Sequence, residues 1–265
     1  MKKVTGFVLI VFILVFILTG CSGESNALTI KNGILLVGMD IDYPPMEYLA
    51  DNGITPIGFD VSLGKALAEK LNLEVQFVDI VWESIFNSVN TRKIDCIISS
   101  VTITEERLQY QNFSKPYIQN TLALVVLKNS RYNVRSPEDL TGLRVAYQYE
   151  TTANEYMDNL ALRGLRFTPS GYDRTMYCFD ELRLGRVDAI LTDLVVAHHY
   201  LTNSDNFDVV WQGDEEQFGI CMRKGNDILT EAIDKALDEL FRDGTMLRLS
   251  REFFNGRDLV SAVRQ

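Results

Sequence analysis

The feature that most constrains the fold is a strand-like motif that occurs twice in the chain. Residues 93–100 read KIDCIISS and residues 186–193 read RVDAILTD, with an offset of 93 positions at every residue. Each copy has a basic residue, an aspartate two positions later, an apolar run and a polar end, which is typical of a buried strand. One repetition over this distance favours two lobes of similar design over a solenoid of many repeats.

Strand-like and helix-like segments alternate around both copies of the motif. Around the first copy, strands are expected at 34–39, 74–78 and 94–99, with helices at 60–71 and 82–90. Around the second copy, strands are expected at 143–147, 166–168 and 187–191, with helices at 153–163 and 174–184. This order implies, for each lobe, a largely parallel sheet covered by helices.

The remainder of the chain lacks a complete strand set of its own. It offers strands at 208–211 and 218–222 and helices at 228–241 and 247–254. We therefore expect it to return to the first lobe, so that the chain crosses between the lobes twice and forms a hinge beside a cleft. The expected boundaries are 33–119 and 219–265 for lobe 1, and 120–218 for lobe 2.

The N-terminal residues are typical of an export signal. Two lysines precede an apolar run over 7–18, which is short for a membrane span but suits a signal peptide. Leu-Thr-Gly before Cys21 is similar to a bacterial lipobox, in which the cysteine is lipidated. We expect a lipoprotein signal peptide at 1–20, a lipid-anchored linker at 21–32, and an exported protein facing the periplasm or the cell exterior. An uncleaved anchor with an accidental cysteine is the alternative.

Charge and cysteine use argue against several functional classes. Loss of the first 20 residues leaves 24 basic residues against 36 acidic ones, a charge near −12, which disfavours nucleic acid or an anionic lipid surface as partner. The other cysteines, Cys96, Cys178 and Cys221, have neither an even count nor metal-ligand spacing. The two histidines are adjacent, at His198 and His199. No metal, cofactor or histidine-based catalytic centre is expected.

Polar residues gather where the expected strands end. In α/β sheets, ligands bind beyond the carboxyl ends of the strands. The residues at or near these ends are Asp40, Tyr43, Ser99, Ser100, Thr102, Glu150, Thr151, Thr152 and Asp193. The duplication places Ser100 and Asp193 at equivalent ends of facing lobes, so we expect this set to line the cleft.

Two charged residues beside the expected cleft match the two charges of an amino acid. Thr104, followed by Glu-Glu and Arg107, is typical of a helix N-terminus that binds an anion. Arg107 can hold a carboxylate through two hydrogen bonds, and Asp193 can accept from an ammonium group. Thr152 with Glu155 predicts a capping box at a second helix N-terminus. The alternatives are a solvated arginine and an aspartate that only caps a helix.

These motifs together resemble one family. The segments DIDYPPMEY, GFDVSL, IDCIISSVTITEER, FSKPY and DGT are similar to the family-3 solute-binding proteins, the polar amino-acid-binding proteins of ABC importers. The resemblance covers about 34–254. It implies an α/β, type II periplasmic-binding-protein fold, with two parallel or mixed sheets flanked by helices and a double-strand hinge. It also implies a monomeric receptor, not an enzyme, that delivers a polar L-amino acid to an ABC transporter permease.

The resemblance assigns roles at the two ends of the site. Arg107, with Thr102 and the backbone around Ser100, matches the α-carboxylate site. Thr152 matches the hydroxyl that the second lobe adds on closure, and Asp193 matches the α-ammonium ligand.

The same resemblance places Asp40, Tyr43 and Trp82 in the side-chain pocket, where two aromatic rings can hold the ligand. An acid beside two rings suits a cationic or amide side chain. Arginine, lysine, histidine and glutamine are the candidates, with the cationic ones slightly ahead.

Glu150 departs from the family pattern, which usually has glycine at that place. It keeps open an enzymatic alternative, a cyclohexadienyl dehydratase for prephenate-like acids with Glu150 as general acid. Asp193 argues against this alternative, because a second carboxylate would repel a dicarboxylate substrate. A sensory lobe that acts through a separate partner is a third possibility.

Overall fold

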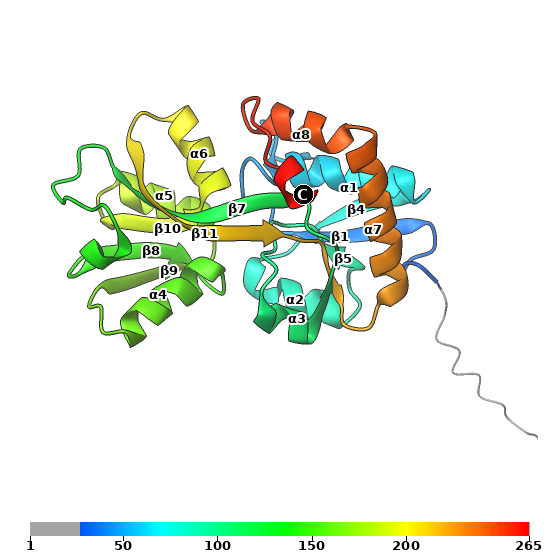
Figure 1. Cartoon of the computed structure of the whole chain (residues 1–265), viewed down its shortest axis with the longest axis horizontal. Coiled ribbons are helices and arrows are strands. Elements are labelled where there is room, and N and C mark those ends of the chain that lie inside the picture. The colour runs from blue at the N-terminus through cyan, green and yellow to red at the C-terminus, as the bar shows by residue number, and fades with distance from the viewer. Residues whose placement is uncertain (1–26, 265) are drawn as a thin grey trace, which may run out of the picture.

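The structure, a computed structural model, describes residues 27–264. The expected signal peptide, Cys21 and the first part of the expected linker lie outside these residues. Two lobes are each built on a five-stranded mixed sheet flanked by helices, so the predicted two-lobed α/β fold is confirmed (Figure 1). Within 27–264 no helix is long and apolar enough to cross a membrane.

Lobe 1 contains a sheet of strand order β4-β1-β5-β12-β6. Its strands are β1 (Ile34–Met39), β4 (Glu74–Asp79), β5 (Cys96–Ile97), β6 (Gln111–Phe113) and β12 (Cys221–Arg223). Its helices are α1 (Phe59–Lys70), α2 (Trp82–Asn90), α3 (Glu105–Tyr110), α7 (Asp227–Arg242) and α8 (Thr245–Phe253). The chain also forms a small hairpin here, β2 (Tyr48–Leu49) with β3 (Pro56–Ile57). β4, β1 and β5 are parallel, whereas β12 and β6 are added antiparallel.

Lobe 2 contains a sheet of strand order β11-β7-β10-β8-β9. Its strands are β7 (Ile118–Leu127), β8 (Arg144–Gln148), β9 (Thr168–Tyr172), β10 (Ala189–Asp193) and β11 (Phe207–Phe218). Its helices are α4 (Thr152–Leu162), α5 (Thr175–Arg183) and α6 (Leu194–Asn203), and short 3-10 turns lie at Pro137–Leu140 and, near the C-terminus, Ser261–Arg264. The duplicated motif ends in β5 in one lobe and in β10 in the other.

Two long antiparallel strands form the hinge. β7 pairs with β11 from Leu127 with Phe207 to Ile118 with Phe218, and both strands run between the lobes (Figure 1). The prediction of a short strand at 208–211 was therefore wrong, because β11 continues through the polar stretch as far as Phe218. Pairing with β7 holds that stretch extended although it lacks apolar alternation.

Two other predicted strands differ from the structure. The ladder of β5 contains only two residues of the predicted 94–99, because the chain turns at Ser100, whose φ is 51°. β9 was predicted at 166–168 but spans Thr168–Tyr172. Pro169 and Gly171 are poor strand formers, and they are tolerated because β9 is the edge strand of its sheet.

Candidate functional site

A cleft lies between the lobes. It opens at the carboxyl ends of β1, β5, β8 and β10. Of the eleven predicted side chains, it is lined by ten: Asp40, Tyr43, Trp82, Ser99, Ser100, Thr102, Arg107, Thr151, Thr152 and Asp193. It is also lined by seven residues that were not in the predicted set, namely Glu47, Leu122, Gln148, Ala153, Thr175, Leu191 and Thr192.

The serines after β5 are held by two buried carboxyl groups. Ser99 Oγ donates to Glu47 Oε1 at 2.6 Å and accepts from the Asp40 backbone N–H at 3.0 Å. The Ser100 N–H donates to Asp60 Oδ2 at 2.8 Å. Burial raises the pKa of Asp60 to about 7 and that of Glu47 well above its usual range. The core strand can continue into a polar turn because the buried carboxyl groups of Glu47 and Asp60 accept hydrogen bonds from that turn.

Arg107 lies at one end of the cleft with uncharged partners. Its guanidinium donates to the backbone carbonyls of Thr102 at 3.0 Å and Glu150 at 3.3 Å. The guanidinium carbon lies 5.6 Å from the ring centroid of Trp82 and 5.3 Å from that of Phe86. Within residues 27–264, no carboxylate forms an ion pair with it. The guanidinium therefore retains N–H donors and a full charge for an anion.

The helix termini beside Arg107 differ in part from the prediction. Thr104 caps α3 as predicted, since its Oγ1 accepts from the Arg107 N–H at 3.1 Å. The capping box predicted for Thr152 is wrong: Thr151 caps α4 and accepts from the Asn154 N–H at 3.3 Å. The chain turns at Glu150, whose φ is 58°, and Thr151 then has the extended backbone that a cap requires.

Asp193 lies at the end of β10 and is buried. Its carboxylate accepts from Tyr43 Oη of the other lobe, and from Asn120 Nδ2 at 2.7 Å. Burial raises the pKa of Asp193 to about 6, and these two hydrogen bonds oppose that shift. Tyr43 and Trp82, predicted to enclose the ligand's side chain, thus contact Asp193 and Arg107 respectively.

Glu216, on the hinge strand β11, was not predicted. Its Oε2 accepts from Thr102 Oγ1 of lobe 1 at 3.3 Å and from Thr152 Oγ1 of lobe 2 at 3.4 Å. Burial, followed by the charge of Asp193, raises the pKa of Glu216 to about 7. The two threonine hydroxyls are therefore fixed by one carboxyl group at the hinge.

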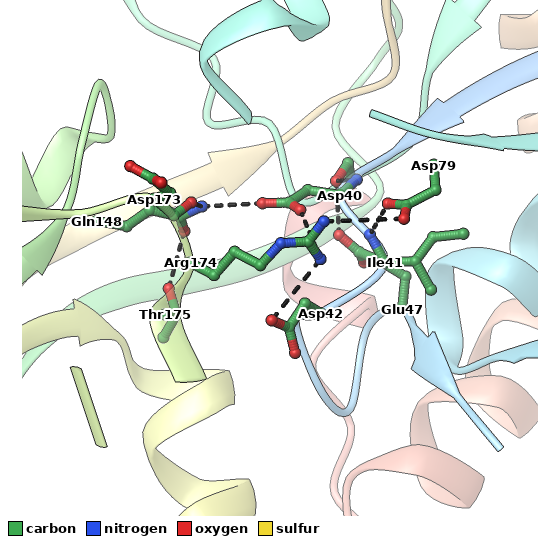
Figure 2. A network of polar contacts seen from close by, with 10 residues as sticks. Asp40, Ile41, Asp42, Glu47, Asp79, Gln148, Asp173, Arg174 and Thr175 are labelled. Atoms are coloured by element: carbon green, nitrogen blue, oxygen red, sulfur yellow. Dashed lines mark hydrogen bonds and ion pairs between the residues drawn. The ribbon is translucent and has the colours of Figure 1, made fainter. Parts of the chain in front are cut away.

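Away from Arg107, polar groups of both lobes meet at Asp40, and Figure 2 shows their contacts. Gln148 Nε2 donates to Asp40 Oδ2 at 2.9 Å, and Thr175 Oγ1 donates to Gln148 Oε1 at 2.8 Å. Asp40 Oδ1 is buried and accepts no hydrogen bond from the described residues. Burial raises the pKa of Asp40 to about 6, and the charge of Arg174 opposes the shift.

Arg174, the residue before α5, extends from lobe 2 to three aspartates of lobe 1 (Figure 2). Its guanidinium nitrogens lie 3.4 Å from Asp40 Oδ1, 3.7 Å from Asp42 Oδ2 and 3.8 Å from Asp79 Oδ2. Burial raises the pKa of Asp42 to about 6, against the effect of Arg174. Arg174 and Gln148 were missed although both follow the strand-end rule, since they lie at the ends of β9 and β8.

Glu150 is the predicted residue that does not line the cleft. Its side chain is exposed, while its backbone carbonyl accepts from Trp82 Nε1 at 2.9 Å and from Arg107. The left-handed backbone at this position is the conformation that favours glycine. The structure therefore removes the observation on which the idea of Glu150 as a general acid in the cleft depended.

The fold and the cleft define a two-lobed ligand-binding protein. The family of bacterial extracellular solute-binding proteins, family 3, matches residues 35–256, and the chain belongs to this family. As a member of this family, the chain is a solute-binding protein.

Three similar proteins illustrate the family. The L-cystine-binding protein TcyJ of Escherichia coli strain K12 is 31% identical over 233 residues, which are 87% of this chain and 85% of that protein. A solved ancestral arginine-binding protein bound to arginine is 36% identical, with a TM-score of 0.80 over 84% of this chain and 98% of that chain. The ancestral amino acid-binding protein AncCDT-1, a precursor of cyclohexadienyl dehydratase, is 32% identical, with a TM-score of 0.79 over 84% and 96%.

Proposed function

We propose that the cleft binds a polar L-amino acid and that the loaded protein delivers it to an ABC importer permease. In this proposal Arg107 binds the α-carboxylate and Asp193 binds the α-ammonium group. The observation that carries it is that Arg107, bonded to carbonyl oxygens alone among its described neighbours, lines the same cleft as the buried Asp193. A cation and an anion that remain available on one cavity suit a zwitterion.

The hydroxyl groups beside these charges support the same orientation. Thr102, Thr151 and Thr152 lie with Arg107 along the cleft. Their hydroxyls donate within the ligand-free protein, to Glu216 and to the Gln148 carbonyl, and each would turn from that acceptor to donate to a ligand carboxylate. Cystine and arginine, named for two of the relatives, share the amino-acid head group and differ in their side chains. A site built around the head group is compatible with either ligand.

The proposal extends to the placement of the protein. We infer a monomer whose lobes are 33–119 with 219–265, and 120–218, exported through the signal at 1–20 and lipidated at Cys21. The linker at 21–32 would hold it on the membrane within reach of the permease. Palmitate labelling of cells that express the wild type or Cys21→Ala tests the anchor, and label in the variant would contradict it.

The binding proposal is tested by calorimetric titration of the purified protein with the common L-amino acids. Arg107→Ala should weaken the affinity for every ligand by about 2–5 kcal/mol, because a desolvated carboxylate loses its cation. The control is Arg248→Ala, which removes an exposed arginine that pairs only with Glu252 among the described residues. Wild-type affinity in Arg107→Ala, or no binding of any amino acid to the wild type, would disprove the proposal.

A further inference from the structure

The end of the cleft opposite Arg107 contains a cluster of four charged side chains from both lobes. We refer to Asp40, Asp42, Asp79 and Arg174 as the interlobe ion cluster (Figure 2). Of the four, only Asp40 lines the cleft, and Arg174 contacts Asp40 without lining the cleft itself. The cluster therefore acts on a ligand through Asp40.

Asp40 has a protein neighbour at each carboxylate oxygen, a hydrogen-bond donor at one and a cation at the other. Gln148 donates to Oδ2 at 2.9 Å, and the guanidinium of Arg174 faces Oδ1 at 3.4 Å. Oδ1 is buried and accepts no hydrogen bond from residues 27–264, so it retains lone pairs for a further donor. A ligand guanidinium that bound both oxygens of this carboxylate would have to share Oδ2 with Gln148 and Oδ1 with Arg174.

The position of Arg174 also makes a second cation unfavourable. A ligand cation at Asp40 would lie close to a guanidinium that contacts the same oxygen, and like charges repel strongly where water is excluded. Arg174 cannot withdraw freely, because three carboxylates would then share the site without a cation. A neutral N–H donor at Oδ1 avoids this repulsion.

We propose that Arg174 is a specificity-determining residue that acts through Asp40 and weakens the binding of cationic side chains relative to neutral hydrogen-bond donors. This inference rests on the proposed function of the same cleft and names its ligand class: amino acids whose side chains are neutral overall and end in a donor. Among common amino acids, glutamine is the probe of this class, and arginine is the probe of the competing one.

The test compares two affinities in each variant of the full mature protein. Calorimetry with L-glutamine and L-arginine gives the ratio of the two dissociation constants for the wild type and for Arg174→Gln. In the variant, the affinity for arginine relative to that for glutamine should increase at least tenfold. The control is Arg186→Gln, which removes an arginine that is 66% exposed and pairs with Glu181 away from the cleft, and it should leave the ratio unchanged.

A second variant reverses the expected sign. Asp42→Asn removes a carboxylate that balances Arg174 but does not line the cleft, so the ratio should shift towards glutamine. A role in lobe closure alone would weaken both ligands equally in both variants, and that result would overturn the inference. Binding of both ligands through Arg107 with an unchanged ratio overturns this inference alone, whereas a wild type that binds no amino acid overturns the proposed function with it.

Discussion

The two ends of the cleft each contain an arginine, and the two arginines are bound in opposite ways. Arg107 donates to backbone carbonyls and has no carboxylate within ion-pair distance among residues 27–264. Arg174 faces three aspartates at 3.4–3.8 Å. The first charge is available to a ligand, and the second is largely balanced inside the protein. We therefore expect the affinity for the amino-acid head group to depend on Arg107 and the selectivity for the side chain to depend on Arg174.

This difference has a structural origin in the strand ends. In lobe 1, the chain after β5 turns at Ser100, and Arg107 on the helix that follows donates back to the carbonyl of Thr102. In lobe 2, β10 runs directly into α6, and Asp193 stays at the junction. The first copy of the duplicated motif is thus followed by a cation, Arg107, and the second copy ends in an anion, Asp193.

The largest expected effect, after the loss of Arg107 itself, comes from the anion at the same end. Asp193→Asn should weaken all amino-acid ligands by about 2–3 kcal/mol, because the ammonium group loses its charged acceptor. The loss should be equal for glutamine and arginine, unlike the change of ratio expected at Arg174. Titration of both ligands measures it, with the exposed Asp205→Asn as control. If Asp193→Asn weakened the binding of only one of the two ligands, Asp193 would also affect side-chain selectivity, and the proposed difference between the two ends of the cleft would be wrong.

A second prediction concerns pH, since carboxyl groups at both ends have raised pKa values. Burial disfavours the charged form and raises the pKa of Asp40 and Asp42 to about 6 and that of Asp60 and Glu216 to about 7. The folded protein therefore binds more protons than the unfolded chain between about pH 4 and 7. The free energy of unfolding of the ligand-free protein should rise as the pH falls from 8 to 5.5, by on the order of 5 kcal/mol.

Urea unfolding at the two pH values measures this difference. Asp42→Asn should reduce the slope, because it removes one of the groups that take up a proton. If the free energy of unfolding instead decreased as the pH falls from 8 to 5.5, the prediction would be wrong. That result would mean that nearby arginines keep these carboxyl groups charged in the folded protein.

The sequence predicted the lobes and most of the head-group end, and it failed at the end that contains Arg174. Strand ends such as Ser99 and Asp193 follow clear apolar runs, so their position could be inferred from the pattern. Arg174 follows β9, an edge strand that contains proline and glycine, and the misplaced strand hid the residue from the strand-end rule. Glu216 was missed for a similar reason, because its extended backbone depends on pairing with β7 rather than on its own sequence.

Glu150 shows the opposite error, because a functional role was predicted for a side chain that is exposed. The backbone at Glu150 has a φ of 58°, and a non-glycine residue in this conformation costs roughly 1–2 kcal/mol. Glu150→Gly should therefore raise the free energy of unfolding by up to about 1 kcal/mol, since relief of strain is partly offset by the freedom of glycine in the unfolded chain.

The same substitution should leave ligand binding unchanged, because Trp82 and Arg107 donate to the backbone carbonyl of residue 150 and not to its side chain. Urea unfolding and titration with glutamine and arginine measure the two effects together. The control is Glu83→Gly, in the first turn of α2, where φ is helical and glycine should destabilise the protein. If Glu150→Gly instead altered the affinity or the ratio of the two ligands, the side chain would belong to the Arg107 end of the cleft, and the contrast between the two arginines would have to include it.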